Sequence, residues 1–439
     1  MEILAIILFL SIFILILYGY PVAFTLGGIS IIYALCFLDP SSYSALPLRI
    51  MGVMDNYILV AVPLFIFMGI MLEKSGLAES LLETMAMLFG TMPGGLAISV
   101  VIVGALLAAS TGIVGATVIT MGLISLPTML KRGYKPELAT GTIASAGTLG
   151  QIIPPSVVLV LLGSVLSVSV GDLFKAALIP GVLLVAAYII YILIFALRNP
   201  EEAPSIPEDE IKAFKKEDFI VKVIKAFVLP LLLIIAVLGS IFMGIASPTE
   251  AAGIGALGAI LLTMSQGKFN LDVLKSVMQE TTHLTCMVFI ILLGATTFTF
   301  VFREMGGDRY LIGLIESANL SPTMFLVLVM IVVFIAGFFI DFIEIIFIIV
   351  PVVAPIFEVY EMNLIWIGIL LALNLQTSFL TPPMAMSAYY LKGVQKNNVE
   401  LMQIFAGIMP FLGIVIFAMF LMYMFPGIAL WLPETLFAD

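Results

Sequence analysis

The chain has 439 residues, of which 62% are hydrophobic and only 10% are charged, and its mean hydropathy is +1.24. A soluble domain carries about 25% charged residues, so this composition excludes a soluble surface and indicates a membrane protein with many spans. Two cysteines and one histidine argue against a disulfide framework or a histidine metal centre, and a net charge of −10 argues against a nucleic-acid partner.

Ten apolar runs follow one another along the chain. The first, residues 3–38, begins without a basic leader or a small-residue cleavage site, so we expect it to be retained in the membrane. The third and the eighth are about 35 residues long, so each forms either two spans or one re-entrant hairpin. The first half contains runs 3–38, 57–72, 96–130, 138–170 and 176–197, and the second half contains runs 226–264, 284–302, 323–357, 364–391 and 401–425.

Prolines and glycines recur at a nearly constant spacing of 227 to 230 residues. Such a period indicates two halves with the same order of elements. Residues 198–225 join the halves and hold 13 charged residues, which predicts a solvated connector with a short surface helix near residues 211–223. The matched positions are Pro21 and Pro248, Gly76 and Gly306, Pro93 and Pro322, Pro127 and Pro355, and Pro154-Pro155 and Pro382-Pro383.

The distribution of basic residues favours hairpins. If both long runs are re-entrant, 14 of the 18 lysines and arginines lie on one side of the membrane. The positive-inside rule makes that side cytoplasmic, with both termini outside and five crossings in each half, so that the second half is inverted. The sequence therefore predicts an all-α polytopic membrane protein, an inverted repeat with two re-entrant helical hairpins and two broken helices. The cytoplasmic segments would be 73–95, 131–137, 198–225, 265–283 and 392–400, and the remaining basic residues are Arg49, Lys175, Arg303 and Arg309.

Four interruptions mix glycine or proline with hydroxyl or amide side chains. Interrupted helices in inverted repeats are typical of secondary transporters. Each proline pair frees upstream carbonyls for a hard cation, and the helix N-termini beyond the breaks favour an anion. The pattern predicts a shared site for sodium and a carboxylate. The interruptions are residues 108–117, 145–156, 336–344 and 374–387, and the freed carbonyls are those of Gly150, Gln151, Phe379 and Leu380.

Other interpretations compete at these positions. A row of small residues from Gly104 to Ala116 also suits plain helix packing. Asp341 and Glu344 share a helical face, and buried carboxylates in a membrane are usually functional, with a structural hydrogen-bonding role as the alternative. The GxGxxG pattern at residues 253–258 follows no strand, so we expect it to serve helix packing. We expect His283 to be an interfacial structural residue.

Six stretches resemble the large membrane subunit of tripartite ATP-independent periplasmic transporters, the DctM-like TRAP family. They are spread over nearly the whole chain. The stretches are GYPVAFTLGG (19–28), VPLFIFMGIMLEKSGLA (62–78), LLAASTGIVGATVITMGLISLP (106–127), LATGTIASAGTLGQIIPPS (138–156), SPTEAAGIGALGA (247–259) and LQTSFLTPP (375–383).

This resemblance implies a multi-pass protein of the bacterial inner membrane that is a transporter and not an enzyme. It implies sodium-driven uptake of an organic acid, with a soluble periplasmic substrate-binding protein and a small four-helix, DctQ-like membrane subunit as partners. It also implies an elevator mechanism, in which a transport domain moves against a scaffold. The scaffold would comprise residues 1–92 and 226–322 and the transport domain residues 93–197 and 323–425, with a cytoplasmic linker at 198–225 and a C-terminal tail at 426–439.

The resemblance also implies site residues, with sodium ions as the sole cofactor. The first sodium site would use Ser110, Thr111 and Gly112 with Ser145, Gly147 and Thr148. The second would use Gly337 and Asp341 with Gln376, Thr377 and Thr381. The acid would lie near the tip at residues 338–341 and near Thr148, Pro154, Ser156, Glu344 and Pro382. Glu344 and Gln376 are similar to a subgroup associated with 2-oxo acids, lactate and related acids, whereas sialic acid and four-carbon dicarboxylates stay open.

Two other functions compete with this interpretation. A single-polypeptide sodium–carboxylate symporter shares the hairpins and the Thr-x-Pro-Pro breaks but needs no soluble partner. A membrane-embedded enzyme would need a catalytic set, and one histidine without a nucleophile elbow does not provide a triad.

Overall fold

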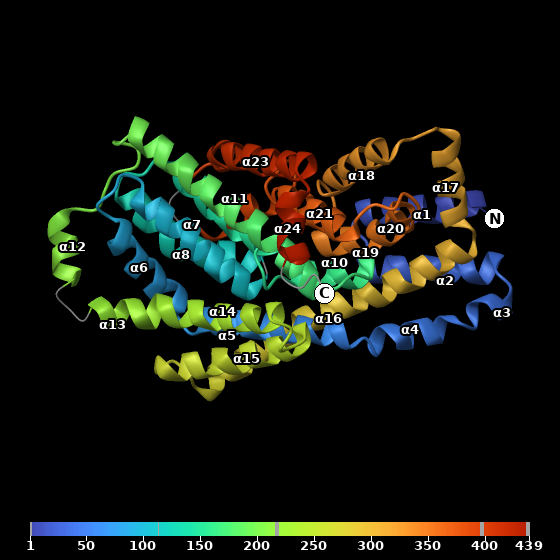
Figure 1. Ribbon diagram of the computed structural model, residues 1–439, viewed down its shortest axis with the longest axis horizontal. Helices are drawn as coiled ribbons and strands as arrows, with labels where there is room; N and C mark the ends of the chain where they lie inside the picture. The colour runs from blue at the N-terminus through green and yellow to red at the C-terminus, as the bar shows by residue number, and fades with distance from the viewer. Residues whose placement is uncertain (1, 113, 216–218, 396–398, 436–439) are drawn as a thin grey trace.

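The computed structural model describes residues 2–112, 114–215, 219–395 and 399–435 (Figure 1). Every regular element in these ranges is helical, which confirms the predicted all-α fold. The first half contains α1 (Glu2–Leu17), α2 (Val22–Phe37), α3 (Pro40–Tyr43), α4 (Leu46–Met54), η1 (Tyr57–Val60), α5 (Ala61–Lys74), α6 (Leu77–Phe89), α7 (Gly95–Thr111), α8 (Val114–Lys131), α9 (Pro136–Thr148), η2 (Leu149–Gln151), α10 (Val157–Leu166) and α11 (Val170–Arg198). The remainder contains α12 (Glu208–Lys215), α13 (Phe219–Val223), η3 (Ile224–Val228), α14 (Leu229–Phe242), α15 (Pro248–Ser265), α16 (Leu271–Glu304), α17 (Gly307–Ser317), α18 (Pro322–Ala336), α19 (Phe342–Ile348), α20 (Val350–Val359), α21 (Leu364–Ser378), α22 (Met386–Val394), α23 (Leu401–Met424) and α24 (Gly427–Thr435).

Several helices are long and apolar enough to cross a membrane. Within the described ranges there are 6 such helices by length and composition. Large hydrophobic side chains on the outside of the molecule are exposed, for example Phe24 at 69% and Leu35 at 63% on α2. A lipid bilayer would cover such a surface, whereas exposing it to water over so many helices would be energetically unfavourable. The six helices are Tyr57–Lys74, Val114–Lys131, Val170–Arg198, Phe219–Phe242, Leu271–Glu304 and Leu401–Met424.

Both long interrupted runs fold back as hairpins. Hairpin 1 turns after α7 at Gly112, whose φ of 61° favours glycine, and α8 returns against α7. Hairpin 2 is closed at its base, where the rings of Phe325 and Phe357 lie 5.0 Å apart and the Tyr360 hydroxyl donates to the carbonyl of Leu320 at 2.7 Å. Its returning arm is bent by 50° between α19 and α20. The two predicted re-entrant hairpins are therefore present.

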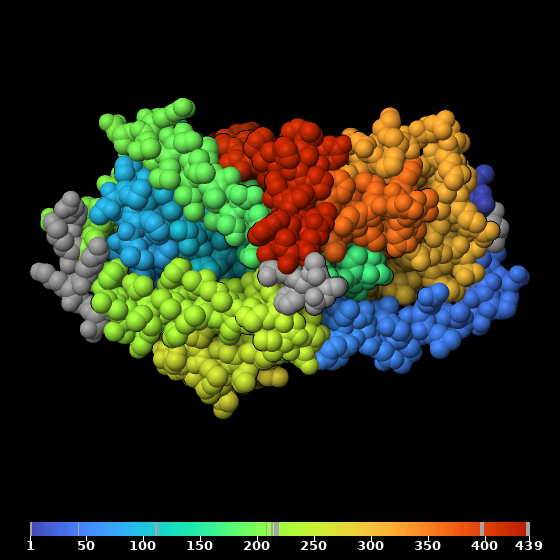
Figure 2. Space-filling view, in the orientation of Figure 1, coloured from blue at the N-terminus to red at the C-terminus, as the bar shows by residue number. Residues whose placement is uncertain are grey.

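The two halves interlock through closely packed helix pairs. Helix α16 packs on α2, and α15 packs on α5. A Cβ atom at Gly255 would lie 2.6 Å from the sulfur of Met68, so this glycine permits the approach of α15 to α5. The GxGxxG pattern thus serves helix packing, as expected. Figure 2 shows α14 and α15 along one edge of the molecule, with α23 at the opposite edge.

Polar links between connecting segments separate into two groups that match the predicted membrane sides. On the predicted cytoplasmic side, Lys74 lies 3.1 Å from Glu280, and the Gln266 side chain donates to the carbonyl of Lys225 at 3.2 Å. On the other side, the Thr249 hydroxyl donates to the carbonyl of Tyr57 at 3.0 Å.

The charged segment between the halves is less solvated than its composition suggests. Ala203 and Ile206 are buried. The amide of Ile206 donates to the carbonyl of Gly90 at 2.7 Å, and the amide of Gly94 donates to the carbonyl of Ala203 at 2.8 Å. The segment after α11 is therefore fastened across the turn between α6 and α7.

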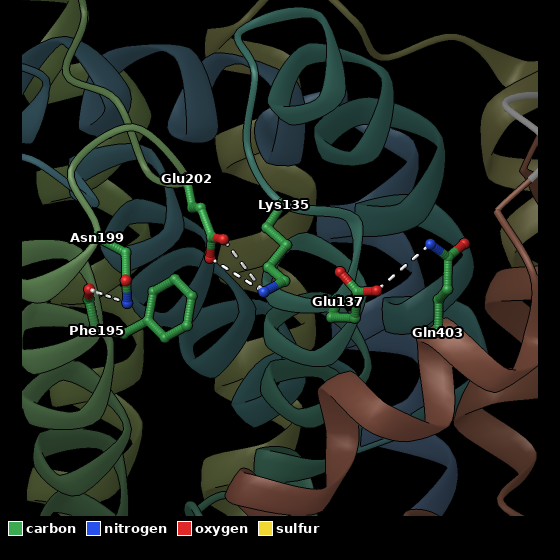
Figure 3. Close-up of polar contacts among 6 residues, drawn as sticks. All are labelled: Lys135, Glu137, Phe195, Asn199, Glu202 and Gln403. Atoms are coloured by element: carbon green, nitrogen blue, oxygen red, sulfur yellow. Dashed lines mark hydrogen bonds and ion pairs between the residues drawn. The ribbon is translucent and has the colours of Figure 1, made fainter.

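Two ion pairs continue this attachment, and we call them the linker clamp. The ammonium of Lys135 lies 3.2 Å from the Glu202 carboxylate (Figure 3), and the guanidinium of Arg132 lies 2.6 Å from the Glu210 carboxylate. The surface helix expected near residues 211–223 is divided. Helix α12 ends at Lys215, residues 216–218 lie outside the described ranges, and α13 leads into α14.

Candidate functional site

Two helices break at proline pairs in equivalent places of the two halves. Helix α9 tightens into η2 before Pro154-Pro155, and α10 begins at Val157. Helix α21 ends before Pro382-Pro383, and α22 begins at Met386. Proline lacks an amide donor, and its ring clashes with the preceding turn of a helix. The two predicted broken helices are present for this reason.

A serine beyond each proline pair is bonded back across the break. The Ser156 hydroxyl donates to the carbonyl of Gln151 at 2.9 Å, and the Ser387 hydroxyl donates to the carbonyl of Phe379 at 2.6 Å. The sequence predicts that these two carbonyls are free for a cation. The carbonyl of Gln151 keeps one further lone pair, whereas that of Phe379 also accepts from the amide of Ser387 at 3.3 Å. Ser156 is also fully buried.

One hydrogen bond joins the broken helices of the two halves. The Gln376 amide donates to the Thr148 hydroxyl at 3.1 Å, and these residues are 228 positions apart, which is the repeat period. The Thr148 hydroxyl donates to the carbonyl of Ser145 at 2.8 Å. All three side chains are fully buried. The structure thus brings together residues assigned to two separate predicted sodium sites.

Six buried side-chain atoms without a hydrogen-bond partner among the described residues belong to these two broken helices. Leaving such a group buried and unpaired costs about 1–3 kcal/mol, so native proteins usually pair it with water or a ligand. The arrangement therefore has unused hydrogen-bonding and coordinating capacity in the interior of the protein. Among the described residues, these atoms are Oγ1 of Thr142, Oγ of Ser145, both amide atoms of Gln151, Oε1 of Gln376 and Oγ of Ser378.

Two predicted sodium ligands of the second half turn toward their own helix. The Thr377 hydroxyl donates to the carbonyl of Asn374 at 2.6 Å, and the Thr381 hydroxyl donates to the carbonyl of Thr377 at 2.7 Å. Each oxygen still has a lone pair for a cation. In the first half, Ser110 and Thr111 belong to α7, but their side chains lie outside the part of the chain that the structure describes.

The tips of both hairpins reach the breaks. A Cβ atom at Gly112 would lie 2.9 Å from the side chain of Val157 at the start of α10, and a Cβ atom at Gly337 would overlap the hydroxyl of Ser378. A Cβ atom at Gly147 would overlap Val118 on α8. Glycine is needed at these three positions for packing, and the close packing places the hairpin tips beside the polar interior of the breaks.

Asp341 and Glu344 form a capping box at the start of α19. The Asp341 amide donates to the Glu344 carboxylate at 3.2 Å, and the Asp341 carboxylate accepts from the amide of Phe342 at 2.8 Å. Asp341 is exposed and Glu344 is half-buried, so the pair borders an accessible space instead of lying sealed in the interior. The close contact of Gly337 with Ser378 places this hairpin tip beside the second break.

The prolines predicted to lie near the substrate differ in burial between the halves. Pro154 is buried, whereas Pro382 is half-buried and its neighbour Pro383 is exposed. The second break is therefore the more accessible of the two. No described contact joins Glu344 to Thr148 or to Pro154.

Sequence reasoning missed the roles of several polar side chains. Gln151 and Ser378 provide unpartnered buried atoms, and the Asn374 amide donates to the carbonyl of Met330 at 2.7 Å, holding α21 against hairpin 2. Ser387 is recognisable as the counterpart of Ser156, because both follow a proline pair. For Asn374, the only signal is an amide in an otherwise apolar run.

An inverted repeat whose hairpins and broken helices meet at a polar interior defines a secondary membrane transporter. A family model described as "Tripartite ATP-independent periplasmic transporter, DctM component" matches residues 9–428. The chain belongs to this family, as its sequence motifs predict, and is an integral membrane protein.

Individual relatives resemble the chain over nearly its whole length. The C4-dicarboxylate TRAP transporter large permease protein DctM of Vibrio cholerae is 29% identical, covering 98% of this chain and 97% of that protein. The sialic acid TRAP transporter large permease protein SiaM of the same species is 28% identical, covering 95% of each chain. The crystal structure of the YdaH transporter of Alcanivorax borkumensis superposes with a TM-score of 0.63 at 13% identity, covering 96% of this chain and 98% of that one. That last likeness concerns the fold alone.

Proposed function

We propose that the chain is the permease subunit for sodium-coupled uptake of a small organic acid. The observation that carries this proposal is the Gln376–Thr148 hydrogen bond between the halves, together with the unpartnered buried polar atoms around it. A cation bound there would satisfy polar groups that otherwise lack partners. Binding would also tie the two broken helices together more firmly.

Sodium is the ion that suits this chemistry. The groups around the central contact are neutral hydroxyl, amide and carbonyl oxygens, which coordinate sodium at the broken helices of transporters. Among the described residues, no group of three or more His, Cys, Asp or Glu side chains is placed to hold a metal ion. The proposed ligands are those of the two predicted sites, centred on Ser145 and Thr148 in the first half and on Gln376 and Thr377 in the second.

A carboxylate is the substrate group that the breaks favour. Helices α10 and α22 begin directly beyond the proline pairs, and their N-termini present amide donors and the positive end of the helix dipole. The two relatives are named for C4-dicarboxylate and sialic acid, which both carry carboxylates. The proposed substrate is therefore a small organic acid, bound near Pro382 and the tip of hairpin 2.

The proposal includes the other parts of a tripartite system and an elevator movement. The family description calls the transporter tripartite and periplasmic, so we propose a soluble periplasmic binding protein and a small membrane subunit as partners. Helix α9 packs against both arms of hairpin 1 and against α23 of the other half. Such packing favours movement of the hairpins and broken helices as one body.

Removal of the central hydroxyl tests the proposal. The change Thr148→Val should raise the sodium concentration for half-maximal uptake about tenfold or more, because a hydrogen bond or ligand contact to a charged group contributes about 1.5–3 kcal/mol. The matched control is Thr263→Val, since Thr263 is equally buried and its hydroxyl bonds only its own helix in α15. Equal uptake by the unaltered complex in sodium and potassium media would reject sodium coupling.

A further inference from the structure

A second cavity lies away from the helix breaks, among segments predicted to face outward. Its volume is about 770 Å³, which is the size of many small-molecule sites. One wall comes from α4 and α16 of the predicted scaffold. The opposite wall comes from the end of α10 and from α20 of the predicted transport domain.

Two hydrogen bonds cross from one wall to the other. The Asn56 side chain donates to the Ser164 hydroxyl at 3.3 Å. The Arg303 guanidinium donates to the carbonyl of Pro351 at 3.4 Å. Between these bridges the cavity is open, so its width depends on how the two predicted domains are placed.

The charged groups of this cavity are not all paired. The Arg303 guanidinium lies 3.1 Å from the Asp308 carboxylate, which neutralises it. Arg49 on α4 is exposed, and among the described residues its side chain makes no hydrogen bond or ion pair. Glu304 and Glu358 also line the cavity and provide negative charge for a cation. Arg49 is therefore the cationic group that is available to an anion.

The cavity lies next to the proposed transport site along two elements. Helix α10 begins at the first break and reaches the cavity at Ser164, eight residues beyond Ser156, which corresponds to about 12 Å of helix. On hairpin 2, the tip at Asp341 and the cavity residue Phe347 are joined by α19. A molecule leaving the cavity along these elements would arrive at the breaks.

We propose that this cavity is a reception site for the substrate on the outer side, where Arg49 binds a carboxylate group before the acid reaches the breaks. The proposal rests on the proposed uptake of an organic acid. Two guanidiniums and three carboxylates line the cavity, so its net charge does not attract an anion. The attraction is local to Arg49, where the cavity walls lower the effective dielectric constant and strengthen a direct ion pair. The hydroxyls of Thr296 and Thr299 in the same wall offer hydrogen bonds to the other polar groups of the acid.

Uptake by arginine variants tests this role. In proteoliposomes holding the complete complex, Arg49→Gln should lower uptake at subsaturating acid at least fivefold, with an unchanged sodium requirement. Arg49→Lys should retain more than half of the uptake. The control Arg309→Gln, on α17 outside the cavity lining, should stay within twofold of the unaltered complex. A twofold or smaller effect of Arg49→Gln, in a complex that transports normally, would overturn the reception site and leave the proposed function intact.

Direct protection of a cysteine separates the two proposals. Thr299→Cys is placed in the cavity wall on a background of Cys36→Ser and Cys286→Ser and is labelled with an impermeant maleimide. At least one of succinate, pyruvate and N-acetylneuraminate should slow the labelling threefold or more, and the added change Arg49→Gln should abolish the protection. If none of the three acids slows the labelling, the reception site is overturned. The labelling is measured on the purified chain, so it decides this point even where the complex fails to transport.

Discussion

The hydrogen bond between Thr120 and Glu73 is expected to hold the conformation described here. The Thr120 hydroxyl on α8 donates to the Glu73 carboxylate on α5 at 2.7 Å. It joins hairpin 1 to the predicted scaffold on the predicted cytoplasmic side. If hairpin 1 moves relative to α5, as the proposed elevator movement requires, this bond breaks in every transport cycle.

The size of the effect follows from the burial of the pair. A hydrogen bond to a charged group contributes about 1.5–3 kcal/mol. The second oxygen of Glu73 is buried and has no partner among the described residues, so Thr120→Val leaves the carboxylate without its only described hydrogen bond. This loss should shift the conformational equilibrium away from the present state by about tenfold to about 150-fold.

Distance measurements between spin labels report this equilibrium. Labels replacing Lys131 on α8 and Lys275 on α16 lie on exposed positions of the two predicted domains. Thr120→Val should convert one main distance into two populations or into a new one. The control Thr128→Val should leave the distribution unchanged, because the hydroxyl of this exposed residue bonds only its own helix. An unaltered distribution for Thr120→Val would refute the role of the Thr120–Glu73 hydrogen bond in holding this conformation.

Three further predictions follow from other parts of the structure. In intact cells, Asp209→Cys should resist an impermeant thiol reagent whereas Glu361→Cys should react, and labelling at position 209 would break the inverted topology. The hydrogen bond from Arg132 holds the pKa of Glu210 below its usual range. This ion pair of the linker clamp therefore contributes stability above pH 4.5, and the contribution is lost as the pH falls through the lowered pKa. Protease cleavage of the linker should rise on acidification, and Glu210→Gln should remove that pH dependence. Gly147→Ala forces a methyl group into hairpin 1 and should cost about 1–3 kcal/mol, seen as a lowered melting temperature, whereas Gly413→Ala, with open space around it, should not lower it.

The repeat was the strongest signal in the sequence, because proline pairs break helices wherever they occur. Matching Pro154-Pro155 with Pro382-Pro383 was enough to predict both broken helices, and the distribution of basic residues predicted both hairpins. The pairing of Thr148 with Gln376 was not predictable in the same way. It depends on how closely the two halves pack together. Glycines at the helix contacts set this distance, and no local sequence pattern predicts it.

Charge misled the sequence analysis in two places. The linker was expected to be solvated because it is rich in charged residues, yet Ala203 and Ile206 are buried, and the Glu202 and Glu210 side chains find basic partners on the turn between α8 and α9. Asp341 was expected to be buried because it lies in an apolar run. An N-terminal cap must stay beside the amides it serves, and here that position opens onto an accessible space.

Reconstitution of uptake tests the central proposal most directly. The purified chain is placed in proteoliposomes with an inward sodium gradient, either alone or with its small membrane subunit and its loaded binding protein. We predict accumulation of the organic acid only when all three components and sodium are present. Strong sodium-driven uptake of the free acid by this chain alone would contradict the tripartite mechanism and would favour a single-polypeptide symporter.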